Sequence, residues 1–151
     1  MDTNTPVPAE SASSIVRPLP PMSADSVAIV REFEDAVLQL PQVKINTEHA
    51  LHAGMYARTI MIPAGTVITG VQIKIPTILI VSGDALFYGD DGTTQFTGYH
   101  VTLGAVGRKQ AIYALADTYL TMMFPTSATT VAEAEEEFTD EPERLGSRRY
   151  E

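Results

Sequence analysis

Nine of the ten glycines of this chain lie in one part of it, and that concentration limits the possible folds more than any other feature of the sequence. No glycine occurs before Gly54, and nine then occur between Gly54 and Gly107. Glycine adopts positive φ angles at no steric cost, so glycines at short intervals mark tight turns between short segments. This stretch is therefore predicted to consist of short strands joined by turns.

Between the glycines, the side chains follow patterns that are typical of β-strands. Residues 55–62 and 67–74 show two-residue alternation, whereas 77–81 and 119–124 are rich in β-branched and aromatic residues, as in strands buried on both faces. The Asp-Asp-Gly sequence at Asp90–Gly92 is typical of a hairpin tip. About seven to nine such strands predict a mainly β domain, either a sandwich or a barrel.

The segments on either side differ from this β-barrel domain, which is assigned to residues 41–125. Residues 1–22 hold five prolines and are predicted to form an extended arm that adds little to the core. Residues 23–40 place apolar side chains at helical spacing, and Pro41 prevents the helix from continuing. Residues 126–151 are predicted to form a short acidic helix followed by a tail.

Charge is distributed as unevenly as glycine. Residues 1–48 carry a net charge of −4 and residues 132–151 one of −5, whereas residues 49–131 hold four acids and four bases. Eight charges in 83 residues is a low density, since charged residues make up about 25% of an average domain. Such a surface is either covered by Thr, Ser and Gly or buried against other subunits. We therefore expect the barrel to form a dimer or a trimer.

Composition argues against several classes of function. The chain has no cysteine, which removes disulfides, thiolate metal sites and cysteine nucleophiles. A net charge of −9 argues against nucleic-acid binding, because affinity for phosphates comes mainly from Lys and Arg. The longest apolar runs fall far short of the ~20 residues that span a bilayer, and no signal peptide is visible, so we expect no membrane contact.

Three histidines and a run of glutamates are the candidates for metal or acid–base chemistry. His49 and His52 form a candidate metal pair, to be completed by Glu48 or His100. Beside a strand start, however, two residues three apart point to opposite faces, which favours two surface imidazoles in a loop. The consecutive glutamates 135–137 cannot all converge on one ion and are interpreted as a solvated helix face. We assign no catalytic residue and no cofactor.

One strand carries the side chains best placed to meet an anion. Tyr56 and Arg58 point to the same side of strand 55–62, which aims a guanidinium either at an anion or at a nearby acid. His100 and Tyr113 are added to them as candidate ligand-binding residues at the mouth of a barrel.

The stretch GMYARTIMIPAGTVITGVQIK, Gly54–Lys74, resembles a motif of cupin-like small proteins encoded in tailed-phage genomes. Pro63–Thr66 matches the Pro-Ala-Gly-Thr turn of that family, and Thr69-Gly70 matches its Thr-Gly. The similarity covers about residues 41–138 and continues through Ser82–Gly92, Gly107–Lys109 and Ala116–Thr118. It implies a cupin-like double-stranded β-barrel, or jelly roll, with an N-terminal arm and helix and a short C-terminal helix.

The histidines that bind metal in such proteins are absent from this chain. By the family's spacing, the ligand positions fall at Ile73, Pro76 and Phe124, which have no donor atoms to offer a cation. The resemblance therefore implies a barrel that binds no metal. We expect these bulky side chains to fill its interior.

Two functions are consistent with these features. The first is a structural or accessory phage virion protein, such as a capsid decoration protein or a tail or connector component. It would occur in the virion and, before assembly, in the host cytoplasm, and residues 1–22 would contact other virion proteins. The second is a metal-free cupin that acts on or binds a sugar or a carboxylate through the four candidate residues, Tyr56, Arg58, His100 and Tyr113.

Overall fold

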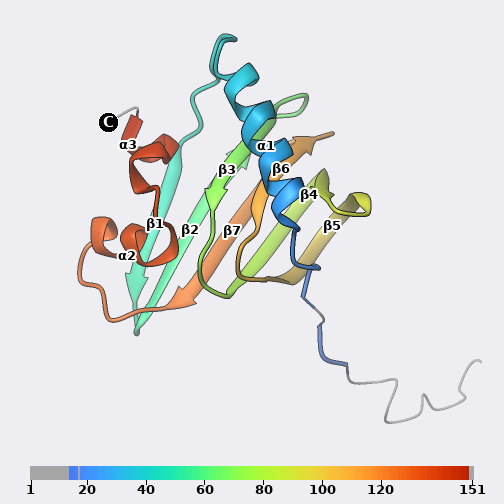
Figure 1. Ribbon diagram of the computed structural model, residues 1–151. Coiled ribbons are helices and arrows are strands. Elements are labelled where there is room, and N and C mark those ends of the chain that lie inside the picture. The colour runs from blue at the N-terminus through green and yellow to red at the C-terminus, as the bar shows by residue number, and fades with distance from the viewer. Residues whose placement is uncertain (1–13, 17, 150–151) are drawn as a thin grey trace, which may run out of the picture.

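The computed structural model describes residues 14–149 apart from residue 17, and its fold is mainly β (Figure 1). Helix α1 (Ala24–Val37) precedes the strands β1 (Thr47–His52), β2 (Met55–Ile62), β3 (Val67–Gln72), β4 (Thr77–Gly89), β5 (Gly92–Gly104), β6 (Lys109–Ala114) and β7 (Thr118–Pro125). Helix α2 (Val131–Phe138), the 3-10 turn η1 (Pro142–Arg144) and helix α3 (Gly146–Arg149) follow them. None of the helices in these residues is long and apolar enough to cross a membrane.

The strands form one antiparallel sheet in the order β1-β2-β7-β4-β6-β3, with β5 paired to β4. The first half of β4 pairs with β7 and its second half with β6, so β4 joins two halves of the sheet. The sheet curls into a half-barrel that stays open between its end strands, β1 and β3 (Figure 1). The predicted fold class, mainly β with short helices before and after the barrel, is confirmed in this form.

Gly83 marks the point at which β4 passes from one half of the sheet to the other. Its φ is +150°, and a Cβ atom there would lie 2.5 Å from Thr118 Oγ1 and 2.7 Å from the Asp117 carbonyl oxygen. The same Thr118 hydroxyl accepts a hydrogen bond from the Asp84 amide at 3.1 Å. Only glycine permits so close an approach. Residues 77–81, predicted as a short strand, are therefore the first part of a longer strand that runs to Gly89.

Ser23 is the N-cap of helix α1, and the start of the helix is held against the hairpin tip. The Ser23 hydroxyl caps the helix, while the Ser23 amide donates to the Asp90 carboxylate at 3.0 Å. Val27 and Val30 are buried as the helical spacing predicts, but Phe33 is 40% exposed. Glu34 is the residue buried in the next turn, because it reaches charged partners on β6 and in the C-terminal segment.

His49 and His52 lie on strand β1 and not in a loop, so that part of the prediction is wrong. Most residues of the Thr-Glu-His-Ala-Leu-His sequence have weak strand propensity, and tertiary pairing overrides it. All six residues pair with β2, which keeps them extended. His49 Nδ1 lies 2.7 Å from the Tyr56 hydroxyl, whereas the His52 side chain is exposed.

Residues 18–22 belong to the barrel, so the predicted boundary of the arm at residue 22 lies too far along the chain. The Leu19 side chain is part of the apolar core, and the Leu19 amide donates to the Leu103 carbonyl at 3.0 Å. Pro18 forms a β-bridge with the same residue of β5. Residues 1–13 of the predicted arm lie outside the described residues.

The segment Thr139–Arg148, predicted as the start of a tail, folds back onto the barrel. The Thr139 hydroxyl donates to the Gln72 carbonyl at 2.8 Å, and Leu145 is buried in the core. The solvated face predicted for the preceding helix is also wrong at Glu135, which is buried, although Glu133 and Glu136 are exposed. Ion pairs that link residues far apart in the sequence account for both differences.

Candidate functional site

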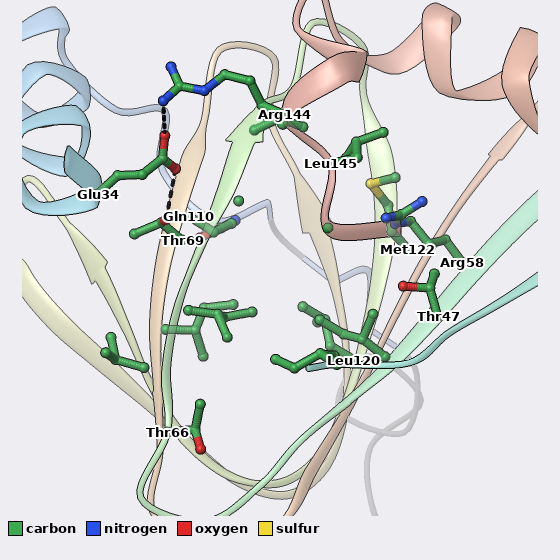
Figure 2. A pocket seen from close by; sticks show the side chains of 18 of the residues that line it. Glu34, Thr47, Arg58, Thr66, Thr69, Gln110, Leu120, Met122, Arg144 and Leu145 are labelled. Carbon is green, nitrogen blue, oxygen red and sulfur yellow. Dashed lines mark hydrogen bonds and ion pairs between the residues drawn. The ribbon is translucent and has the colours of Figure 1, made fainter. Parts of the chain in front are cut away.

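A cavity of about 420 Å³ lies between the two halves of the sheet. Its apolar wall includes Ile60, Ile68, Leu79, Ile112, Leu120 and Met122. Figure 2 shows Leu120 and Met122 on one side of this space and Thr69 and Gln110 on the other. Segment 38–45, which connects α1 to β1, and the end of the C-terminal segment complete the lining.

The expectation of a filled interior is therefore wrong. Of the three positions that spacing equates with metal ligands, Ile73 lines the cavity without filling it. Phe124 is buried in the aromatic core against Tyr56, and Pro76 is exposed. No group of three His, Cys, Asp or Glu residues that could hold a metal ion occurs in the described part of the chain.

The cavity is open to solvent near segment 38–45, where Leu40 and Val43 line it and are exposed. Water can therefore reach the polar groups of its wall. A ligand with an apolar body that displaces this water buries the apolar side chains of the wall.

Four charged residues line this cavity: Glu34, Arg58, Arg108 and Arg144. The three arginines outnumber the single carboxylate, although the whole chain carries a net charge of −9. The excess of positive charge is therefore local to the interior. How much of this charge is available to a ligand depends on which protein groups each arginine already contacts.

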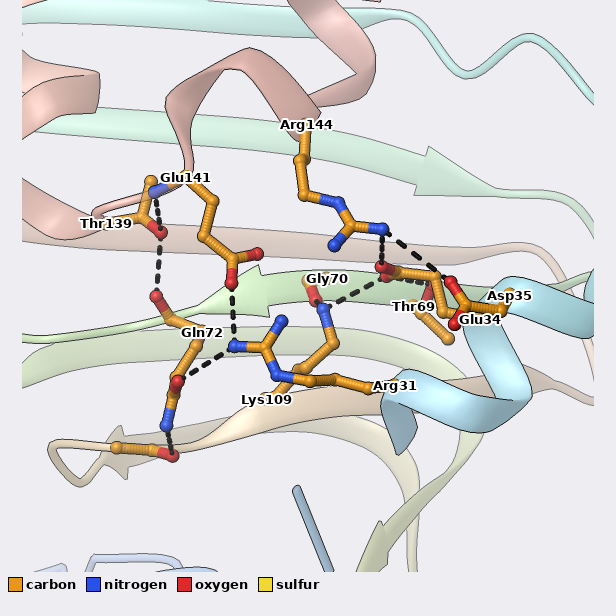
Figure 3. Close-up of polar contacts among 11 residues, drawn as sticks. Arg31, Glu34, Asp35, Thr69, Gly70, Gln72, Lys109, Thr139, Glu141 and Arg144 are labelled. Atoms are coloured by element: carbon orange, nitrogen blue, oxygen red, sulfur yellow. Dashed lines mark hydrogen bonds and ion pairs between the residues drawn. The ribbon is translucent and has the colours of Figure 1, made fainter. Parts of the chain in front are cut away.

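Glu34 accepts hydrogen bonds from three sides, as Figure 3 shows. Lys109 Nζ, Arg144 Nη2 and the Thr69 hydroxyl lie 3.0, 2.9 and 2.7 Å from its carboxylate oxygens. Burial alone raises the pKa of Glu34. The hydrogen bonds from Thr69 and Lys109 and the charges of Lys109 and Arg144 outweigh burial and hold that pKa below its ordinary value. The carboxylate thus joins α1, β6 and the C-terminal segment.

Arg58 is held from behind by a second buried carboxylate. Its Nη1 donates to Glu135 at 2.9 Å, and its Nη2 donates to the Ser147 hydroxyl at 3.1 Å. Glu135 also accepts from Arg148 Nε at 2.9 Å. Burial raises the pKa of Glu135, but these hydrogen bonds together with the charge of Arg58 lower it overall. Two arginines thus share one carboxylate, and only Arg58 lines the cavity.

Arg108 is almost completely buried, at 3% exposure, and lies within 4 Å of no carboxylate in the described residues. It donates to the carbonyls of Pro20 and Tyr88 and to the Gln110 side chain, while its Nε has no hydrogen-bond partner there. Burial lowers the pKa of Arg108, and the negative charge of Asp90 opposes this effect. Arg108 therefore adds positive charge to the wall of the cavity, and Asp90 offsets that charge in part.

The structure brings together two of the four residues that the sequence grouped as a candidate binding site. Arg58 lines the cavity and donates to the hydroxyl of Tyr56, which is buried and stacks on Phe138. His100 and Tyr113 are exposed on β5 and β6 and do not line the cavity. Arg108 and Arg144 were not among the candidates, because no local motif marks charges that come from distant parts of the chain.

No protein-family model matches this chain, and no curated protein matches it. Among solved structures, it is similar to ectoine synthase from P. lautus, with 18% identity, a TM-score of 0.48 and coverage of 66% of this chain and 76% of that one. It is also similar to a protein with a double-stranded β-helix domain from Klebsiella pneumoniae, with 14% identity, a TM-score of 0.47 and coverage of 62% and 83%. A cupin-2 domain protein from Shewanella frigidimarina has 11% identity, a TM-score of 0.44 and coverage of 62% and 91%.

Two of the three descriptions name a cupin-2 domain or a double-stranded β-helix domain. None of the three mentions a phage.

Proposed function

We propose that this protein is a metal-free cupin-like barrel that binds one small, largely apolar molecule in its interior. The observation that carries the proposal is the 420 Å³ cavity, whose volume falls within the range of small-ligand sites, roughly 300–1,000 Å³. The wall combines apolar side chains with a few charged groups, as such sites do. Contact with solvent near segment 38–45 gives a route of entry, since Leu40 and Val43 line the cavity and are exposed.

Binding of the neutral fluorophore aminoanthracene tests this proposal. Leu120→Trp places a large ring in the cavity and should abolish the increase in fluorescence. Leu115→Trp is the matched control, because Leu115 is exposed, does not line the cavity and receives the same ring. The proposal is supported if the wild type and Leu115→Trp bind the fluorophore saturably and Leu120→Trp does not. Absence of binding by the wild type, or equal binding by both variants, would contradict it.

A second proposal, that the chain is a structural or accessory phage virion protein, is supported by the phage-family resemblance and by an uncharged outer face. This face belongs to β4, β5 and β7, where Ile78, Ile80, Ser82, Tyr99, Val101, Tyr119 and Thr121 point away from the core. Tyr99 and Tyr119 are 67% and 56% exposed and flank Ser82 in the register.

We propose that a second copy of the chain covers this outer face. Two such faces meet without burying a charge, so the contact carries no cost of desolvating a charged group. Tyrosine is well suited to the centre of an interface, since it offers a large apolar area together with a polar end. Association of copies is a requirement for a decoration or connector protein, and it is what the low charge density of residues 49–131 led us to expect.

Sedimentation of the purified chain tests the association, and co-sedimentation with assembled virions tests the assignment to a particle. Wild-type protein should sediment as a dimer or trimer at micromolar concentration. Tyr119→Lys should shift it to the monomer, whereas Leu115→Lys, at an exposed position outside this face, should not. A wild-type monomer would contradict self-association, and failure to co-sediment with virions would contradict the virion assignment.

A further inference from the structure

The geometry points to an organic carboxylate as the ligand class of this cavity, with the carboxylate held by Arg58 and the apolar body against Ile60, Leu120 and Met122. This inference rests on the proposed ligand-binding function and narrows it. It depends on the charge of the cavity wall, on the free donors of Arg58 and on the scarcity of neutral polar groups.

The charges around the cavity do not balance. Five cations line it or lie directly behind its wall, namely Arg58, Arg108, Lys109, Arg144 and Arg148. In the described part of the chain their close partners are two buried carboxylates, Glu34 and Glu135, and Asp90 acts on Arg108 from the hairpin tip. The exposed Asp35 adds one distant contact of 3.9 Å to Arg144. An apolar interior that holds surplus guanidinium charge gains from an anion that enters it.

Arg58 is the cation best placed to meet that anion. A guanidinium has five N–H donors. Nη1 is occupied by Glu135 and by the Tyr56 hydroxyl, and Nη2 uses one hydrogen for Ser147. The Nε hydrogen and the second Nη2 hydrogen have no protein partner among the described residues, and Figure 2 shows the guanidinium directed into the space beside Met122. A carboxylate can accept both bonds.

Neighbouring groups fix the position of Arg58. Glu135 and Ser147 hold it from behind, so little side-chain freedom remains to be lost when a ligand binds. Thr47 pairs with Ile60 on the neighbouring strand, diagonal to Arg58, and lines the same cavity, where its hydroxyl can donate to the carboxylate.

The rest of the wall favours a carboxylic acid over a sugar. Each hydroxyl of a sugar needs a hydrogen-bond partner when it is buried. The neutral polar side chains that line the cavity are few and come from separate elements, namely Gln42, Thr47, Thr66, Thr69, Thr77 and Gln110. Thr69 is already committed to Glu34. A ligand with one anionic end and an apolar body satisfies Arg58 and leaves no polar group of the ligand itself unpaired.

Displacement of bound aminoanthracene by decanoate and by decanol tests the inference. The two probes share their chain and differ in the carboxylate. Hydrogen bonds to charged groups contribute about 1.5–3 kcal/mol, so decanoate should bind at least about tenfold more tightly. The ratio of the two affinities should approach one in Arg58→Gln.

Arg148→Gln is the matched control, because it also removes one cation from Glu135 but does not line the cavity, and it should keep the preference for decanoate. Melting curves report whether each variant folds. If Arg58→Gln is unfolded, the wild type alone tests the inference. Its preference for decanoate over decanol should disappear at acidic pH, because decanoate is then protonated and loses its charge. Equal affinities in the wild type, or an equal loss of the ratio in both variants, would overturn the inference and leave the proposed function standing. No binding of aminoanthracene would overturn the proposed function itself.

Discussion

The inner wall of the cavity and the outer face of β4, β5 and β7 are built from the same strands and differ in where they carry charge. On β7, Leu120 and Met122 face an interior lined by three arginines, while Tyr119 and Thr121 face outward among uncharged side chains. Proteins usually place charge outside and apolar groups inside. Here three arginines line the interior, and the outer face is built from uncharged side chains. We therefore propose a ligand for the interior and a second copy of the chain for the outer face.

The largest loss of stability is expected when a charged residue beside the cavity is removed. Lys109→Met removes a cation that is 0% exposed and leaves Glu34 with fewer partners, so the free energy of unfolding should fall by about 3–5 kcal/mol. Lys74→Met is the control, because the Lys74–Asp140 pair is exposed and contributes about 0–1 kcal/mol. Urea denaturation measures both, and equal losses would show that the buried pair has no special role.

Phe124→His tests whether one added histidine is enough to create a metal site in the interior. The ring packs edge-on against Tyr56 and Phe138, so a polar imidazole in its place should destabilise the fold by about 2–3 kcal/mol. The variant should bind no zinc or nickel after dialysis. Near-stoichiometric metal in its elemental analysis would contradict the assignment of this position to the core.

Deletions at the N-terminus separate the part that belongs to the barrel from the part that the structure does not describe. Deleting residues 1–22 removes the buried Leu19 and its bond to Leu103, and should cost about 2–3 kcal/mol of unfolding free energy. Deleting residues 1–13 removes no described contact and should change it by less than about 0.5 kcal/mol. Thermal melting of both deletion variants measures these changes. Equal melting temperatures would contradict the conclusion that the chain belongs to the barrel from about residue 18 onward.

Acid should destabilise the fold by protonating the two buried carboxylates, Glu34 and Glu135. The pKa values of Glu34 and Glu135 are lowered in the folded state from the ordinary value of 4.5, so their stabilisation is present above that pH and is lost as the pH falls through the folded values. Unfolding free energy measured from neutral to acidic pH should therefore decline below about pH 4.5. The Glu135→Gln variant should show a shallower decline.

The outer face should behave in the opposite way, with little effect on folding. Tyr119→Lys replaces an exposed ring, so it should change the free energy of unfolding by no more than about 0.5 kcal/mol. Its effect on sedimentation should be large if a second copy covers this face. A loss of stability as large as that of Lys109→Met would mean that Tyr119 stabilises the fold of the single chain.

Local patterns were sufficient to predict the fold class but not the site. The glycines and the alternation of residues 55–62 indicated strands correctly, and the apolar spacing of residues 23–40 indicated the helix that spans Ala24–Val37. The cavity depends on Glu34, Arg108 and Arg144, which are far apart in the sequence and meet only through the curl of the sheet and the return of the C-terminal segment. Glu135 was interpreted as solvated because its neighbours are acidic, and its partner Arg58 lies 77 residues away.

The central claim is that the cavity holds a carboxylate with an apolar body, and a calorimetric titration of decanoate at several temperatures tests it most directly. Burial of apolar surface gives a negative change in heat capacity, which is the most dependable sign of this kind of binding. Wild-type protein should show saturable heat at a stoichiometry of one, with a negative heat-capacity change, and Leu120→Trp should show none. A wild type without saturable heat, or a Leu120→Trp variant that binds equally well, would contradict the account.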